Sequence, residues 1–142
     1  MSAEENKGLV RRLYEEVNKG NLAIVEELIS TDFVLHHPLS PEVLRGPEGF
    51  KQLVTRLQTA FPDLSIAAED MLAEGDKVAV WFTVRGTHQG VLLDMPPTDK
   101  PVNLTGVAMY RVAGGKIIED RVAEDLLALM QQLGAFPARG QS

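Results

Sequence analysis

The sequence of 142 residues contains no cysteine. Without a thiol the chain forms no disulfide framework, no thiolate metal site and no cysteine nucleophile. It also lacks an uninterrupted apolar run of roughly 18 residues, the length that a membrane-spanning helix requires, so no membrane partner is expected. The first residues, Met1 to Asn6, are acidic and polar, which is unlike a secretion signal. We therefore expect a cytoplasmic protein.

Clusters of lysine and arginine are absent as well. Fourteen basic residues stand against twenty acidic ones, for a net charge of −6. Nucleic-acid-binding proteins usually carry a basic patch, so the composition argues against a nucleic-acid partner. A length of 142 residues suits one domain with its own core. We expect a single domain over residues 1–142, with an ordered core over about 3–134 and a loosely ordered tail over 135–142.

Helical patterns dominate the first sixty residues. Ser2 and Glu5 have the spacing of a capping box, and apolar residues then recur every three or four positions up to Val17. Asn21 is suited to cap a second helix that continues to Ile29. A short strand is predicted over 33–37, ended by Pro38. Gly46-Pro47 then opens a third helix, which ends at Phe61.

From Leu64 onward the pattern changes to strands and turns. Strands are predicted over 64–74, 77–90 and 102–113, with a fourth after the turn at Gly114-Gly115. On the second of them, Val78, Val80, Phe82 and Val84 alternate with polar residues, as in a sheet with one covered face. A short helix before Gly134 closes the pattern. Segregated helices and strands indicate the α+β class. We expect a curved antiparallel sheet wrapped around three N-terminal helices as a cone with an internal pocket.

The last predicted strand is unusually charged, with Glu119, Asp120, Arg121, Glu124 and Asp125 in one short stretch. Some of these side chains must face solvent. Our hypothesis is that Asp125 instead faces a cavity and carries out proton chemistry there. The alternative is structural, because an aspartate directly before Leu126-Leu127 is a favoured helix N-cap.

Several short motifs occur together in this order. They are G-P-E-G-F at 46–50, A-F-P-D-L at 60–64, G-T-H-x-G at 86–90, G-K-I-x-E at 115–119 followed by Asp125, and Q-Q-L-G at 131–134. In their order and spacing the chain, from about Leu9 to Gly134, resembles the SnoaL-like polyketide cyclases. That family belongs to the cystatin-like α+β cone superfamily, with ketosteroid isomerase and scytalone dehydratase.

The resemblance implies a cofactor-free enzyme, usually dimeric, that closes a ring of a small apolar or polycyclic carbonyl compound by intramolecular aldol condensation. It implies that Asp125 is the general acid and base, and that His36 and His88 line the pocket. The chain departs from the family in one place: relatives often carry His-Trp after the glutamate, where this sequence has Asp120-Arg121. A wall that is usually aromatic would then become a charged pair.

The expected chemistry suits these residue types. One carboxylate can remove a proton between two carbonyls and later protonate the alkoxide, provided that a dry pocket raises its pKa into the working range. A neutral His88 could stabilise the enolate oxygen, although a core histidine bonded to the backbone is the competing interpretation. His36 and His37 are adjacent on a strand, so only one faces inward, and the resemblance favours His36.

Ligand pockets are mostly apolar with a few placed polar groups. For contact with the substrate we expect Trp81, Met109, Leu93 and Met95, together with Arg121, which could also pair with Asp125 and lower its pKa. The three histidines show no short-range metal-ligand spacing, so neither a metal nor a cofactor is expected.

Two other functions remain open at this point. One is a non-catalytic small-ligand binding protein of the same fold. The other is a hydrolase or dehydratase in which Asp125, Arg121 and a further carboxylate surround one water. A homodimer is expected because the outer sheet face carries Ala79 and Trp81 among polar residues.

Overall fold

The computed structural model describes residues 2–135. The expected loose tail therefore lies almost wholly outside the described residues. The helices are α1 (Ala3–Asn18), η1 (Leu22–Ile24, a 3-10 turn), α2 (Val25–Leu28), α3 (Gly46–Ala60) and α4 (Leu126–Leu133). The strands are β1 (Ile29–His36), β2 (Leu44–Arg45), β3 (Ser65–Glu74), β4 (Lys77–Thr87), β5 (Pro101–Ala113) and β6 (Lys116–Glu124).

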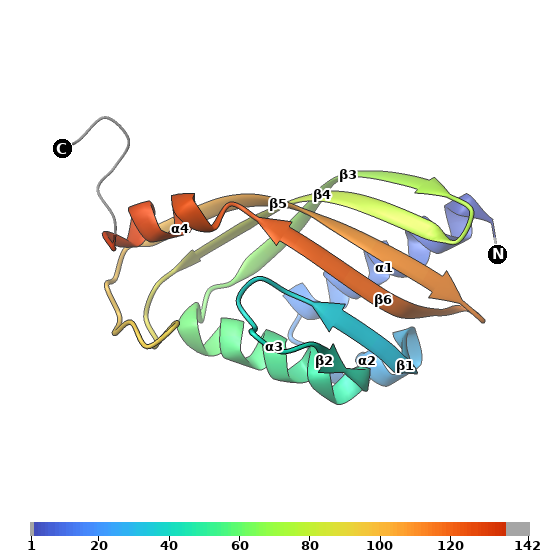
Figure 1. Ribbon diagram of the computed structural model, residues 1–142, viewed down its shortest axis with the longest axis horizontal. Coiled ribbons are helices and arrows are strands. Elements are labelled where there is room, and N and C mark those ends of the chain that lie inside the picture. Colours follow the sequence, from blue (N-terminus) through green and yellow to red (C-terminus); the bar gives the residue numbers. More distant parts are fainter. Residues whose placement is uncertain (1, 136–142) are drawn as a thin grey trace.

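The strands form one curved, unclosed six-stranded sheet in the order β2-β1-β6-β5-β4-β3. Helices α1, α2 and α3 lie against its concave face, while α4 extends from the end of β6 (Figure 1). The predicted α+β class and wrapped sheet are confirmed. The sheet is not purely antiparallel, however, because β1 pairs with β6 in parallel. The two-residue strand β2 pairs antiparallel with β1 at the edge.

Local sequence signals explain most of the helix boundaries. The capping box at α1 is present, with Glu5 N–H donating to Ser2 Oγ (3.1 Å) and Ser2 N–H donating to Glu5 Oε1 (3.0 Å). The second predicted helix is too long. Asn21 gives no side-chain cap and bonds to Glu16 instead, and the chain is already extended at Ile29, where β1 begins.

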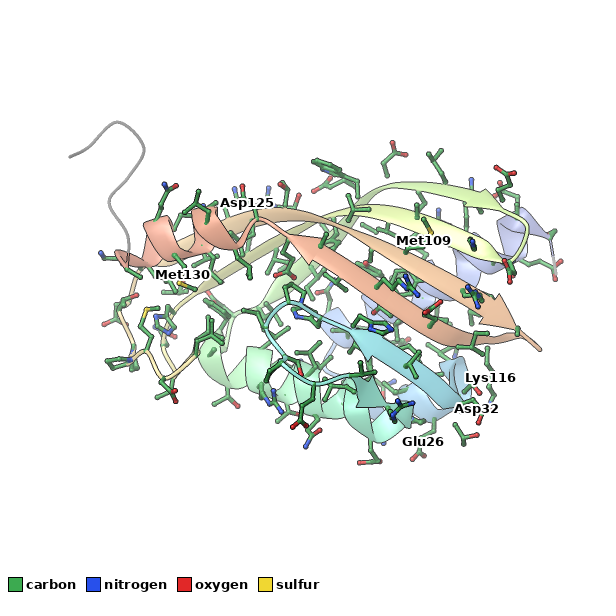
Figure 2. The ribbon with its side chains drawn as sticks, in the orientation of Figure 1. Glu26, Asp32, Met109, Lys116, Asp125 and Met130 are labelled. Atoms are coloured by element: carbon green, nitrogen blue, oxygen red, sulfur yellow. The ribbon has the colours of Figure 1, made fainter. Side chains whose placement is uncertain are left out.

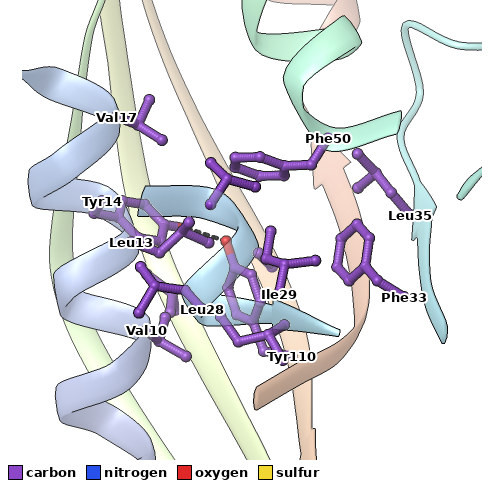
Figure 3. Packing of buried hydrophobic residues seen from close by; sticks show 14 of the residues in the cluster. Val10, Leu13, Tyr14, Val17, Leu28, Ile29, Phe33, Leu35, Phe50 and Tyr110 are labelled. Carbon is purple, nitrogen blue, oxygen red and sulfur yellow. Dashed lines mark hydrogen bonds between the residues drawn. The ribbon is translucent and has the colours of Figure 1, made fainter. Parts of the chain in front are cut away.

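Most of the core lies between α1, α3 and the inner face of the sheet. Phe33 and Phe50 meet edge to face at 6.2 Å, and so do Tyr14 and Tyr110 at the same centroid distance. Figure 3 shows Tyr14 on α1 beside the hydroxyl of Tyr110. The alternation predicted for β4 is confirmed, because Val78, Val80 and Phe82 are buried whereas Trp81 is half exposed.

A β-bulge at Ile118 determines which residues of β6 face inward. Val112 pairs with Ile117, but the next pair is Arg111 with Glu119, so Ile118 has no partner on β5. One extra residue reverses the side-chain alternation that follows. Ile117 is therefore buried before the bulge, and Asp120 is buried after it.

Candidate active site

A mainly apolar cavity lies between the concave face of the sheet and helices α1 and α3. Its apolar walls come from leucine, valine, phenylalanine and isoleucine side chains of α1, α3, β3, β4, β5 and β6. The polar side chains that line it are Tyr14, His37, Tyr110, Asp120 and Glu124. This is the composition expected of a small-molecule site: apolar walls and a few convergent polar groups.

Asp120 is the most unusual of these groups. It comes from β6 between Leu35 on β1 and Tyr110 on β5, and only 4% of it is exposed. Its Oδ1 atom is buried without a hydrogen-bond partner among the described residues. Burial, helped by the negative charge of Glu124, raises the pKa of Asp120 well above its usual value. A buried carboxyl of raised pKa in a cavity is suited to proton transfer.

The two tyrosines form a buried donor pair beside Asp120. The Tyr110 hydroxyl donates to the Tyr14 hydroxyl at 2.9 Å, the contact drawn in Figure 3. Burial raises the pKa of both phenols, and the negative charge of Asp120 raises both further. Both hydroxyls therefore keep their protons, and the Tyr14 proton is available to an acceptor in the cavity.

His37 and Glu124 form the other polar group of the cavity. His37 Nε2 lies 3.3 Å from Glu124 Oε1, and the two side chains are 5% and 7% exposed. On its other side, His37 Nδ1 accepts a hydrogen bond from the Leu39 N–H at 3.1 Å. The neutral ring therefore carries its proton on Nε2, which faces the carboxylate.

Asp125 does not face the cavity, so its predicted orientation is corrected. Its side chain is exposed and accepts a hydrogen bond from the Ala128 N–H at 3.0 Å, as the N-cap of α4. Figure 2 shows it where β6 gives way to that helix. The reason is the bulge at Ile118, which places Asp125 on the same face as Arg121 and leaves Asp120 on the inner face.

The two predicted histidines also lie outside the cavity lining. His36 points outward near Glu119 with 44% of its side chain exposed, because Phe33 and Leu35 share the inward parity with His37 instead. His88 is fully buried but belongs to the connection after β4, where Nδ1 contacts Thr98 at 3.0 Å. Its Nε2 is buried without a partner among the described residues.

None of the five predicted substrate contacts lines the cavity. Trp81 and Met109 lie on the outer face of the sheet, 50% and 41% exposed. Leu93 is 51% exposed at a left-handed backbone position, and Met95 packs against a second apolar cluster around Phe61 and Leu129. Arg121 is on the outer face of β6, where its Nε donates to Glu119 Oε2 at 3.0 Å.

Sequence reasoning thus missed Asp120, Glu124, His37 and the tyrosine pair. For His37 a signal was present, since alternation from Phe33 and Leu35 leads inward to it. For Asp120 no local signal reveals the bulge, and strict alternation from buried Ile117 leads to Asp125. Within residues 2–135 no group of three or more His, Asp or Glu side chains is arranged to hold a metal ion. No helix of that part of the chain has the length and apolar character of a membrane span.

Comparison with known proteins identifies the family. The family model for the SnoaL-like polyketide cyclases matches residues 8–133. The aklanonic acid methyl ester cyclase DauD of Streptomyces sp. (strain C5) is 35% identical in an alignment of 133 residues, which covers 89% of this chain and 80% of that protein. The nogalonic acid methyl ester cyclase of Streptomyces nogalater is 31% identical over 82% of this chain and 88% of its own. The structure of IdmH from Streptomyces antibioticus superposes with a TM-score of 0.80 at 32% identity, covering 91% of this chain and 98% of IdmH. The chain therefore belongs to the SnoaL-like polyketide cyclase family.

Proposed function

We propose that this cyclase closes a ring in a polycyclic keto ester by intramolecular aldol condensation, with Asp120 as the general acid and base. The observation that carries the proposal is one carboxyl group. Asp120 is buried, has an oxygen without a partner among the described residues and lines a mainly apolar cavity. Burial of an unpaired carboxyl is costly, and it is common where the group does chemistry.

The reaction needs one group that moves a single proton twice. Ionised Asp120 removes a proton from the carbon between two carbonyls, and the C–H electron pair becomes the enolate. The enolate carbon then forms a bond to a second carbonyl carbon, whose oxygen becomes an alkoxide and takes the proton back from Asp120. The raised pKa of Asp120 favours the first transfer, because it brings the base closer in strength to a weak carbon acid. The second transfer stays downhill, because a carboxylic acid is still a much stronger acid than the alcohol that forms.

Tyr14 is suited to stabilise the developing negative charge. Its hydroxyl accepts from Tyr110, so its own proton can be donated to a substrate oxygen, and a donor already in place stabilises the transition state more than the ground state. Two relatives are named as cyclases of aklanonic acid methyl ester and nogalonic acid methyl ester. We therefore infer that the substrate of this chain is a methyl ester of the same kind.

The test compares Asp120→Asn with the wild-type chain on both methyl esters. Loss of the acid and base should lower turnover by roughly 10² to 10⁴-fold. Asp125→Asn is the matched control, since an asparagine still caps α4 and the side chain lies outside the cavity; its turnover should equal that of the wild type. Wild-type turnover in Asp120→Asn would refute the assignment.

The structure bears on both alternative functions, the non-catalytic binding protein and the hydrolase or dehydratase. Asp125 is exposed and caps α4, which would favour ligand binding without turnover if the cavity contained no other acid. Asp120, however, is an acid that lines the cavity. Binding of either ester without any turnover would establish that alternative. The hydrolase or dehydratase needs Asp125 and Arg121 around one water in the cavity. Both face outward, and we do not propose it.

We also infer that two copies of the chain pack through the outer face of the sheet. Four large apolar side chains are exposed on that face: Leu72, Trp81, Val107 and Met109. They lie on β3, β4 and β5 as cross-strand neighbours, Trp81 opposite Val107 and Ala79 opposite Met109. A contiguous apolar patch of this kind usually marks an interface. The cytoplasmic location stays a prediction, which cell fractionation would test.

A further inference from the structure

The inward face of β6 carries two acidic side chains rather than one. Asp120 and Glu124 are four residues apart with Val122 between them, and all three line the cavity. Four residues of a strand span about 13 Å between Cα atoms. A ligand that reaches Asp120 with its reacting carbon can therefore also meet Glu124 with a more remote part. Nothing in the aldol step itself uses that second carboxylate.

His37 holds Glu124 in place. The Leu39 N–H fixes the Nδ1 side of the ring at 3.1 Å and leaves the proton of the neutral ring on Nε2, which lies 3.3 Å from Glu124 Oε1. Both side chains are more than nine-tenths buried. Among the described residues, only His37 lies within ion-pair distance of Glu124. A carboxylate has about four acceptor positions, and one imidazole N–H fills at most one of them.

Glu124 lines a cavity whose walls are mainly apolar, so a ligand in that cavity can use its remaining acceptor capacity. A buried carboxylate that lacks donors is costly, and a ligand hydroxyl would supply one. A ligand cation is less suitable. Its desolvation between leucine and phenylalanine side chains costs more free energy than it gains from pairing with a carboxylate that His37 already shares. A neutral hydroxyl on a fused ring meets both conditions, since the ring fills the apolar space and the O–H donates.

We propose that Glu124, positioned by His37, is a substrate-binding residue that accepts a hydrogen bond from a neutral hydroxyl on a ring remote from the carbon that reacts at Asp120. This proposal rests on the proposed function, because it assumes that the cavity binds a polycyclic substrate. It makes Glu124 a specificity-determining residue, which selects ring systems hydroxylated at that end. His37 acts through Glu124 and is a positioning residue.

The experiment measures binding rather than turnover. The probes are 2-naphthol and its methyl ether, 2-methoxynaphthalene, which share the ring and differ in the donor. Binding is followed by naphthalene fluorescence in the full-length Asp120→Asn variant, where residue 120 offers the phenol an uncharged and weaker acceptor. Hydrogen bonds to charged acceptors are the strong ones, so 2-naphthol should bind about 10- to 100-fold more tightly than the ether.

Matched variants separate Glu124 from a general effect of charge or folding. Added to Asp120→Asn, Glu124→Leu should abolish the preference for 2-naphthol, and Glu124→Gln, which keeps a weaker acceptor and the shape, should leave only a small preference. Glu119→Gln, on the opposite face of the same strand, should retain it fully. In the same way His37→Gln should reduce the preference, whereas His36→Gln should not.

Three results would overturn the proposal. The first is equal binding of the two probes, including no binding of either, by the Asp120→Asn protein. The second is a preference that survives in both Glu124 variants. The third is tighter binding of naphthalen-2-ylmethanamine than of 2-naphthol, which would make the group recognised at Glu124 a cation. Because no probe can cyclise, a protein that shows the preference but turns over neither methyl ester would refute the cyclase mechanism and leave this inference standing.

Discussion

At the scale of single residues, Asp120 makes the folded state sensitive to pH. Burial and Glu124 raise its pKa above the ordinary value of 3.8, so between the two values the folded chain holds a proton that the unfolded chain has lost. Stability then falls as pH rises through that window. In urea unfolding at a series of pH values, Asp120→Asn should remove this fall and be more stable than the wild type near neutral pH. If Asp120→Asn kept the pH profile of the wild type, this prediction would be contradicted.

Asp63 should show the opposite slope and serves as the control. Thr87 donates to its carboxylate from N–H (2.7 Å) and from Oγ1 (2.8 Å), which lowers the pKa of Asp63. A lowered pKa contributes stability above the unfolded value of 3.8 that is lost as pH falls below it. Asp63→Asn should therefore flatten the acid limb of the profile and leave the neutral limb unchanged.

Asp125 contributes to stability through its cap. Asp125→Ala removes the acceptor of the Ala128 N–H, and loss of a cap costs about 1 kcal/mol. Asp125→Asn should cost a few tenths at most, because asparagine caps as well. Chemical denaturation of the two variants measures the difference. Equal loss in both would show that the negative charge, rather than the cap, is what the position requires.

The candidate site shows how one residue limits prediction from sequence. Alternation along β6 allows two sets of inward-facing residues, and the bulge at Ile118 decides between them. The bulge depends on how β6 pairs with β5 more than on the sequence of β6 itself. The same strand therefore predicts Asp125 in the cavity without the bulge and Asp120 with it. Along β1, where no bulge intervenes between Phe33 and His37, alternation alone suffices.

At the scale of elements, the loop after β4 is fixed to the end of α3. Gln89 N–H and Gly90 N–H both donate to Ala60 O, at 2.9 and 3.1 Å. A Cβ on Gly90 would lie 2.0 Å from Thr59 O, a backbone atom that cannot move aside alone. Gly90→Ala should therefore destabilise the chain by about 1–3 kcal/mol, as overpacking does, and thermal or urea unfolding measures it.

Gly8 on α1 provides the matched control for Gly90. It is an exposed helical glycine, and a Cβ there would meet no atom within 4 Å. Gly8→Ala should stabilise the chain by roughly 0.5–1 kcal/mol, because alanine gives up less backbone entropy in a helix. Similar losses in both variants would mean that the close approach at Thr59 does not determine the effect.

The elements themselves could mostly be predicted. The capping box, the proline at the start of α3 and the alternation on β4 act locally, so their patterns are complete within a few residues. The pairing of β1 with β6 is different, since it joins residues that are 85 to 88 positions apart and no local pattern encodes it. That pairing is what brings His37 to Glu124, so their proximity could not be predicted from the residues around either of them.

At the scale of the whole molecule, the sheet has two faces of different character. The concave face holds the cavity and its acids, whereas the outer face carries the apolar side chains of Trp81, Val107 and Met109. Sheets pack face to face at about 10 Å through such side chains. Packing through the outer face would leave the cavity of each copy untouched, so assembly and catalysis can be separated by mutation.

Trp81→Lys tests that separation. Trp81 lies in the middle of the patch and is 50% exposed, so a lysine there would bury a charge in the proposed interface, which is costly. Sedimentation should give twice the 15.6 kDa chain mass for the wild type and a single mass for the variant, with turnover per chain unchanged. Leu127→Lys, on α4 and 59% exposed, is the control and should remain dimeric. A wild-type chain that sediments as a monomer would refute the interface, because a stable one must bury about 800 Å² on each partner and would persist at the concentrations used.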